Sequence, residues 1–189
     1  MNMSTPAVYS LIKPSSRWLE IPILLSFNLL LVALAQLAIN LPLSPVPITG
    51  QTLGVLLIGM ALGRVRGTAV VLAYLVEGAA GLPVFAGGRA GMAVLLGPTG
   101  GYLLGFVAAA FAVGYLADRG WDRKLWLCVT AMTFGTTIIF ASGLAWLANF
   151  VPSGSLMTMG LTPFIPGALL KIAVASVILP AVWRFVGRK

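Results

Sequence analysis

The sequence contains no histidine and a single cysteine, Cys128, among its 189 residues. Without histidine, the chain cannot build the histidine-based catalytic triads, H-E-x-x-H zinc sites or histidine-ligated haem sites of many membrane enzymes. One cysteine cannot form an intramolecular disulfide or a cysteine metal cluster, and the apolar surroundings of Cys128 favour a buried thiol. We therefore expect no metal site and no cofactor.

Acidic residues are also scarce, since the chain has four against twelve lysines and arginines. Glu20, Asp118 and Asp122 lie at the ends of apolar segments, and Glu77 lies inside one. These residues do not suggest a general acid and base pair, and the sequence has no G-x-x-x-x-G-K-[ST] phosphate loop. The sequence thus argues against an enzyme and against ATP hydrolysis by this chain alone, although a membrane enzyme acting on a lipid or peptide is a competing hypothesis.

The chain is very apolar: 59% of its residues are hydrophobic, 8% are charged, and its mean hydropathy is +1.02. A soluble domain of this composition would have little polar surface to present to water. We therefore expect one all-α integral membrane domain over residues 1–189. The net charge of +8 does not indicate a nucleic-acid partner, because the cations are scattered between apolar segments.

Six apolar blocks predict six transmembrane helices, over residues 21–40, 48–63, 67–81, 98–117, 125–150 and 163–186. The second and third blocks are short, because about 15 residues rise only about 22 Å against a hydrocarbon core of about 30 Å. A cavity is expected near such short, glycine-bearing segments. The first block is too long for a cleaved signal peptide, so we expect a retained helix behind a short cytoplasmic segment, residues 1–17.

The connecting segments sort by charge, which predicts both termini on the cytoplasmic side of a bacterial inner membrane. The outer segments 41–47, 82–97 and 151–162 then hold one cation, Arg89, and Lys171 lies about eight residues into the last block. The remaining ten of the twelve cations lie on the inner side: Lys13, Arg17, Arg64, Arg66, Arg119, Arg123, Lys124, Arg184, Arg188 and Lys189. This topology predicts a multi-pass protein whose cavity opens outward.

Arg89 and Lys171 are the first candidates for a binding site, because a charge at membrane depth is costly unless it is paired, hydrated or liganded. Two plainer roles stay open: Lys171 can extend toward the outer headgroups, and Arg89 can be an ordinary loop residue. Counted together with Glu77, the two cations leave one positive charge unbalanced. A monocarboxylate is therefore the expected ligand.

Further polar groups lie near the same end of the predicted bundle. Thr49 and Gln51 follow a proline-rich segment, residues 41–47, and offer hydrogen bonds to a ligand or cap the second helix. Tyr74 and Glu77 share one face of the third helix. Glu77 is expected either to accept hydrogen bonds from the ligand or to form a structural bridge with one of the cations.

Three motifs occur in order along the chain: Pro45-Val46-Pro47-Ile48-Thr49 with Gln51-Thr52, Gly81-Leu82-Pro83-Val84-Phe85-Ala86-Gly87-Gly88, and Gly97-Pro98-Thr99-Gly100-Gly101-Tyr102. With these motifs the chain resembles the BioY family, the biotin-specific S components of energy-coupling-factor (ECF) transporters. The resemblance covers about residues 33–171. An S component for another small anionic vitamin is an alternative that the topology allows.

The resemblance implies a six-helix membrane protein that captures biotin with high affinity in an outward cavity, with biotin as transported ligand rather than cofactor. It also implies a transmembrane coupling subunit and ATPase subunits as partners, and leaves open a homo-oligomer acting without them. Asn28 and neighbouring leucines replace small residues that the family uses to dock the coupling subunit, so this contact is expected to differ.

Carried over by position, Arg89 and Lys171 fall where the family has polar ligand contacts, and residues 163–171 match its Pro-x-x-Pro-Gly-x-x-x-Lys pattern. The family commonly has an acid three residues before that lysine. Here the position is Ala168, and Glu77 is our hypothesis for its replacement. The full predicted site comprises Arg89, Lys171, Glu77, Tyr74, Thr49, Gln51, Val84, Phe85, Gly87, Gly88, Thr99 and Tyr102.

Overall fold

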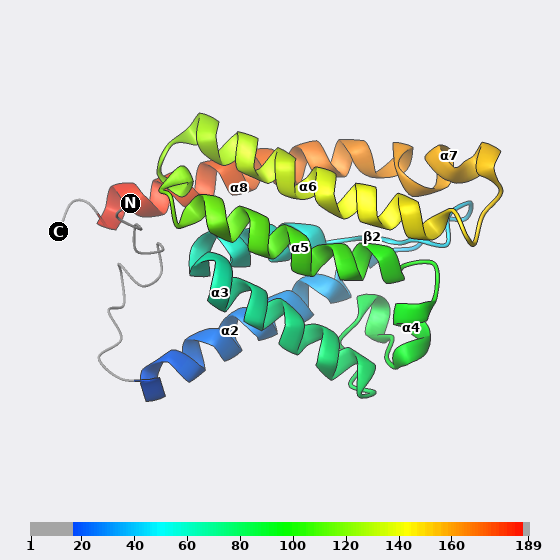
Figure 1. Cartoon of the computed structure of the whole chain (residues 1–189), viewed down its shortest axis with the longest axis horizontal. Helices are drawn as coiled ribbons and strands as arrows, with labels where there is room; N and C mark the ends of the chain where they lie inside the picture. The colour runs from blue at the N-terminus through cyan, green and yellow to red at the C-terminus, as the bar shows by residue number, and fades with distance from the viewer. Residues whose placement is uncertain (1–16, 187–189) are drawn as a thin grey trace.

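The computed structural model describes residues 17–186, apart from the side chains of residues 17 and 184–186 (Figure 1). The predicted cytoplasmic segment 1–17 therefore lies almost entirely outside the described residues, as do the predicted inner cations Arg188 and Lys189. The elements are α2 (Arg17–Gln36), β1 (Ala38–Ile39), β2 (Ile48–Thr49), α3 (Gln51–Ala79), η1 (Ala86–Gly88), α4 (Met92–Leu96), α5 (Gly100–Ala117), η2 (Trp121–Arg123), α6 (Leu125–Leu147), η3 (Ser153–Ser155), α7 (Leu156–Gly160), η4 (Thr162–Phe164) and α8 (Ile165–Val186).

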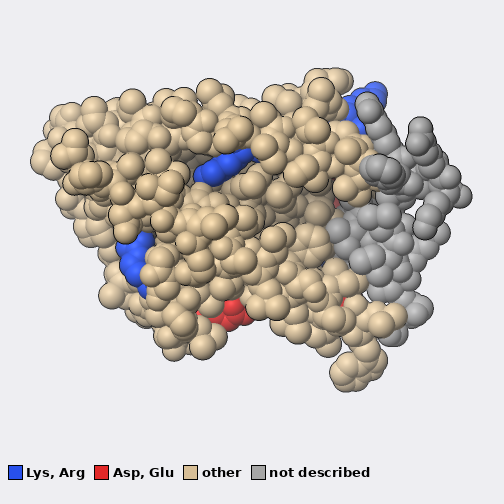
Figure 2. All heavy atoms as spheres, turned by 180° about the vertical axis from the view of Figure 1, so that it is seen from behind, with Lys and Arg blue, Asp and Glu red and all other residues tan. Residues whose placement is uncertain are grey.

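The structure is mostly helical and carries apolar helices of membrane-spanning length. Within the described residues, five stretches are long and apolar enough to cross a membrane: Trp18–Gln36, Gln51–Ala79, Gly100–Ala117, Leu125–Leu147 and Ser153–Trp183. Figure 2 shows a broad face on which charged side chains are few and scattered among uncharged residues. The chain is thus a helical, multi-pass membrane protein, as its composition predicts.

Helix α3 contains both of the short blocks that the sequence predicts as separate helices. Gly63 interrupts it with φ 77° and ψ 177°, a backbone conformation that side chains other than glycine strongly disfavour. A Cβ atom on Gly67 would lie 2.8 Å from the Cα atom of Gly59, so the chain turns back on itself at this break. Two arms, residues 51–62 and 64–79, result, and Figure 1 shows them running in different directions.

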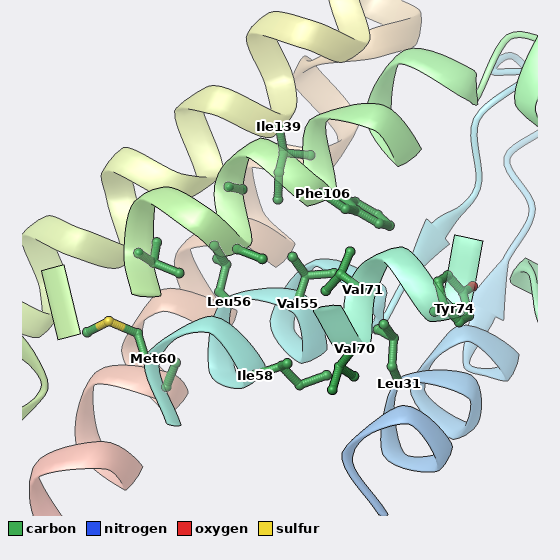
Figure 3. Close-up of a cluster of buried hydrophobic side chains, with 14 of the residues drawn as sticks. Leu31, Val55, Leu56, Ile58, Met60, Val70, Val71, Tyr74, Phe106 and Ile139 are labelled. Atoms are coloured by element: carbon green, nitrogen blue, oxygen red, sulfur yellow. The ribbon is translucent and has the colours of Figure 1, made fainter. Parts of the chain in front are cut away.

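The core lies where both arms of α3 pack against α5 and α6. Val55 from the first arm and Val71 from the second are fully buried, together with Phe106 of α5 and Ile139 of α6 (Figure 3). Large apolar side chains also cover the outside of the helices, among them Leu25, which is 55% exposed. Since lipid is as apolar as these side chains, close packing rather than escape from water holds the helices together.

The segments between the long helices gather at one end of the bundle. In Figure 1, β2, α4 and α7 lie at the end where α5 begins and α6 finishes. The proline-rich segment forms the turn of a hairpin, in which β1 and β2 pair antiparallel with Ala38 opposite Thr49. The sequence predicts a stiff, extended wall here but not this strand pairing, which depends on contacts between residues about ten apart in the chain.

Candidate binding pocket

A pocket lies at the end of the bundle where these connecting segments gather. It holds about 810 Å³ of empty space, part of it open to solvent. Its apolar wall comprises Val46, Pro47, Ile48, Leu56, Phe85, Ala86, Val94, Tyr102, Leu103, Phe106, Ile139, Phe140, Phe164 and Ala168. Polar and charged side chains complete it: Thr49, Gln51, Thr52, Arg89, Thr99, Thr136 and Lys171.

Lys171 projects from α8 into this pocket and reaches the beginning of α3. Its Nζ atom donates to the backbone oxygen of Thr49 over 2.5 Å and to Oγ1 of Thr52 over 2.8 Å. An ammonium group has three donors, so one is left for a bound molecule. Because these two partners hold the ammonium inside the pocket, the structure does not support the interpretation in which Lys171 extends to the headgroups.

Arg89 lies at the mouth of the pocket, on the segment that follows η1. Its side chain is exposed, and its Nε atom donates to the backbone oxygen of Ala86 over 3.1 Å. The turn is closed by a hydrogen bond of 3.0 Å from the backbone N–H of Phe85 to the backbone oxygen of Arg89. One edge of the guanidinium is thus held by the protein, and the other N–H groups can bind an anion.

Two aromatic rings form the flat parts of the wall, and each packs on a glycine. Phe85 is 1% exposed and lies on Gly78, where a Cβ atom would collide with its ring. Tyr102 lies on Gly143 in the same way, and its hydroxyl donates to the backbone oxygen of Gly160 over 2.7 Å. Any side chain at either glycine would collide with a ring of the pocket wall.

Tyr74 stands behind the wall rather than in it. Its hydroxyl accepts a hydrogen bond of 2.6 Å from Nε2 of Gln51 and donates to the backbone oxygen of Val84 over 3.0 Å. Gln51 in turn accepts at Oε1 from the hydroxyl of Thr49 over 3.0 Å. This chain of hydrogen bonds fixes Thr49 and Gln51, two of the polar side chains that line the pocket.

Glu77 lies outside the pocket as well. Its carboxylate accepts a hydrogen bond of 3.1 Å from Nδ2 of Asn28 on α2, and it forms no ion pair with a cation in the described part of the chain. Tyr74, which precedes Glu77 on the same face of the helix, does not line the pocket either. The geometry therefore does not support Glu77 as the replacement for an acid at position 168, whereas Ala168 itself lines the pocket.

Of the twelve predicted residues, the pocket brings together seven: Thr49, Gln51, Phe85, Arg89, Thr99, Tyr102 and Lys171. The other five do not line it: Tyr74, Glu77, Val84, Gly87 and Gly88. Gly87 and Gly88 instead shape the turn before Arg89, with φ angles of 67° and 73°. The charged groups that line the pocket are thus two cations without an acid.

The sequence did not predict that residues in the middle of the long helices line the pocket. Thr136, Ile139 and Phe140 of α6 follow the spacing of one helical face, but nothing in the sequence says which face of α6 meets a cavity. Phe164 and Thr52 also line the pocket. The sequence did offer a reason to consider Thr52, because this residue ends the motif at residues 45–52.

Comparison with known proteins adds a family to this geometry. Residues 12–188 match the model of the BioY family. A biotin transporter BioY of Rhizobium etli is 39% identical over 165 residues, which cover 82% of this chain and 88% of that protein. One from Thermotoga maritima is 40% identical over 141 residues, which cover 74% of this chain and 82% of that protein.

A solved structure agrees in fold as well. The crystal structure at 2.1 Å of the S-component for biotin from an ECF-type ABC transporter superposes with a TM-score of 0.76 and 27% sequence identity, covering 90% of this chain and 95% of that one. The family match spans the three motifs and the pocket that their residues form. The resemblance seen in the sequence is confirmed, and the chain belongs to the BioY family.

Proposed function

We propose that this chain captures biotin and carries it across the bacterial cytoplasmic membrane, as the S component of an ECF transporter. The relatives are named biotin transporters, and the solved neighbour is described as an S component for biotin. The observation that carries the proposal is the pocket itself, an apolar and aromatic wall interrupted by two cations with no acid. Such a pocket suits a small molecule with an apolar body and one carboxylate.

The groups of biotin match the groups of the pocket. Its bicyclic ring and aliphatic chain would pack against Phe85 and Tyr102, and its carboxylate would meet Arg89 or Lys171. The ureido group has two N–H donors and one carbonyl acceptor, which Thr49 and Gln51 can satisfy. Binding and translocation require no covalent change in biotin and no cofactor.

We further propose a single domain, residues 1–189, that crosses the membrane six times with both termini in the cytoplasm. The break at Gly63 supports this count, because it divides α3 into two arms, one for each of the two short blocks that the sequence predicts. The positive-inside pattern of the sequence supports the orientation. The pocket then opens to the outside, as capture of an external vitamin requires.

The proposed partners are a transmembrane coupling subunit and ATPase subunits. The sequence has no phosphate loop, so ATP hydrolysis that drives import would come from another protein. Co-purification from cells that express all subunits tests this partnership. If the chain purifies alone and still supports biotin uptake, action as a homo-oligomer replaces this proposal.

Calorimetric titration of the purified chain with biotin tests the function directly. We expect saturable binding below micromolar concentration, and unchanged biotin recovered by mass spectrometry. The absence of binding at micromolar concentration would reject the substrate. Competition by other carboxylate vitamins, such as pantothenate or nicotinate, would favour the alternative S-component hypothesis, and chemical change of a lipid or peptide would favour the enzyme hypothesis.

A further inference from the structure

A second hollow lies on the outer surface of α5 and α6, away from the pocket. It is a shallow, open hollow lined by Phe111, Ala112, Tyr115 and Leu116 of α5 and by Phe134 of α6, with about 530 Å³ of empty space that includes its open side. We call these five residues the α5–α6 groove. Phe111 and Phe134 are 51% and 53% exposed, so the groove faces the lipid side of the bundle.

One end of this groove is strongly cationic. The guanidinium carbon of Arg119 lies 3.4 Å from the centroid of the Tyr115 ring, and Nη2 of Arg119 donates to the Tyr115 hydroxyl. The guanidinium carbon of Arg64 lies 5.9 Å from the same centroid. Two arginines therefore converge on a single residue of the groove.

Among the described residues, Arg64 forms an ion pair with a carboxylate and Arg119 does not. Nε of Arg64 lies 3.6 Å from Oδ2 of Asp118, whereas Arg119 forms no ion pair with any carboxylate among residues 18–183. Arg64, Arg119 and Asp118 together leave one net positive charge. Arg119 is exposed, so an external anion can reach it.

The position of Arg119 relative to the apolar span indicates the membrane depth of this charge. The span over α5 ends at Ala117, so Arg119 lies two residues beyond it, at the level where lipid headgroups begin. The groove extends from there along the apolar part of α5 and α6. A cation at headgroup level therefore adjoins an apolar groove at acyl-chain level.

We propose that the α5–α6 groove binds one anionic phospholipid, with its phosphate at Arg119 and an acyl chain along Phe111 and Phe134. A guanidinium binds phosphate oxygens through two parallel hydrogen bonds, and basic pockets between membrane helices select anionic headgroups. A zwitterionic lipid carries its own cation beside the phosphate, so it gains less from the unbalanced charge. This site is separate from the biotin pocket and does not depend on the function proposed above.

Native mass spectrometry of the purified protein, titrated with phosphatidylglycerol or with phosphatidylcholine of the same acyl chains, tests the site. The wild type should retain roughly tenfold more phosphatidylglycerol than phosphatidylcholine. Arg119→Gln should abolish this preference. Arg123→Gln is the matched control, because the guanidinium carbon of Arg123 lies 4.3 Å from the ring of Trp183, and Trp183 is not a residue of the groove.

A second variant tests the apolar half of the site. Ala112→Phe fills the groove and leaves Arg119 in place, so it should lower phosphatidylglycerol retention without changing the charge. Size-exclusion profiles and Tm in detergent check that each variant is folded. The proposal is overturned if both lipids bind equally well to the wild type, if Arg119→Gln keeps the preference, or if Arg123→Gln loses as much of it.

Discussion

The ammonium of Lys171 on α8 lies 2.5 Å from the backbone oxygen of Thr49 at the end of β2, although 122 positions separate the two residues in sequence. This hydrogen bond connects the last helix to the hairpin beside the pocket. Lys171 thus joins two distant parts of the wall and places a cation in the pocket. Its removal should affect both binding and the closure of the pocket.

Lys171→Met is expected to weaken biotin binding by roughly 2 kcal/mol or more, about thirtyfold in Kd, because a charge-assisted hydrogen bond in a desolvated site is lost. Calorimetric titration measures the change. Lys124→Met is the control, since it removes the same charge from a residue that does not line the pocket. Equal affinity in wild type and Lys171→Met would exclude Lys171 from the site.

Arg89→Gln is expected to weaken biotin binding by a similar amount, roughly 2 kcal/mol. Titration with biotin amide, which lacks the carboxylate, shows which cation binds that group. Replacing the cation that binds the carboxylate should weaken the binding of biotin but hardly change the binding of the amide, because the amide cannot form the ion pair. If both variants reduce binding of the two ligands by the same factor, neither cation binds the carboxylate.

Ala168→Asp is expected to tighten biotin binding, because Ala168 lines the pocket, where two cations have no acid to balance them. Ala168→Asn has nearly the same shape without the charge, so it separates electrostatics from steric effects. Glu77→Gln should leave the Kd within about twofold, since Glu77 bonds to Asn28 outside the pocket. A large loss of affinity in Glu77→Gln would restore Glu77 to the site.

Gly143→Val is expected to lower both Tm and biotin affinity, with an overpacking cost of about 1–3 kcal/mol, because the new side chain would collide with the ring of Tyr102. Gly154→Val is the control. No atom lies within 4 Å of a Cβ at Gly154, so this change should be tolerated. Normal Tm and affinity in Gly143→Val would show that the ring moves without cost.

Asp122→Asn is expected to raise Tm in detergent at neutral pH. Asp122 is fully buried in η2, outside the predicted spans, and burial raises its pKa, although the hydrogen bond from Nε1 of Trp183 opposes that shift. Since the folded state holds the proton more tightly than the unfolded state, Asp122 costs stability as the pH rises above about 3.9, the ordinary Asp pKa.

The Tm difference between Asp122→Asn and the wild type should therefore shrink as the pH falls toward about 3.9, because the wild-type carboxyl is then increasingly protonated in both the folded and the unfolded state. Thermal unfolding of wild type and variant over a pH series measures this dependence. Asp118→Asn is an informative comparison, because the Asp118 pKa is also raised by burial while Arg64 opposes the shift. A Tm difference that does not vary with pH would contradict the account for Asp122.

Much of the pocket was accessible from the sequence because its signals are local. The motif at residues 45–52 and the motif at residues 97–102 each bring residues into the wall, and the isolated cations Arg89 and Lys171 both line it. A lone charge in an apolar segment needs a partner in any fold, so the sequence alone identifies it as a functional candidate. The hydrogen bonds of Lys171 to Thr49 and Thr52 inside the pocket are visible only in the coordinates.

Reading the residues in order is enough to find the membrane class, the family and the two cations, because hydropathy, charge and short motifs are properties of neighbouring residues. Which face of each helix meets the pocket is set by packing in three dimensions. That packing turns Glu77 toward Asn28, places Tyr74 behind Gln51 and brings α6 into the wall. Helical rotation and packing fix these directions through contacts between segments far apart in the chain, and no local pattern records such contacts.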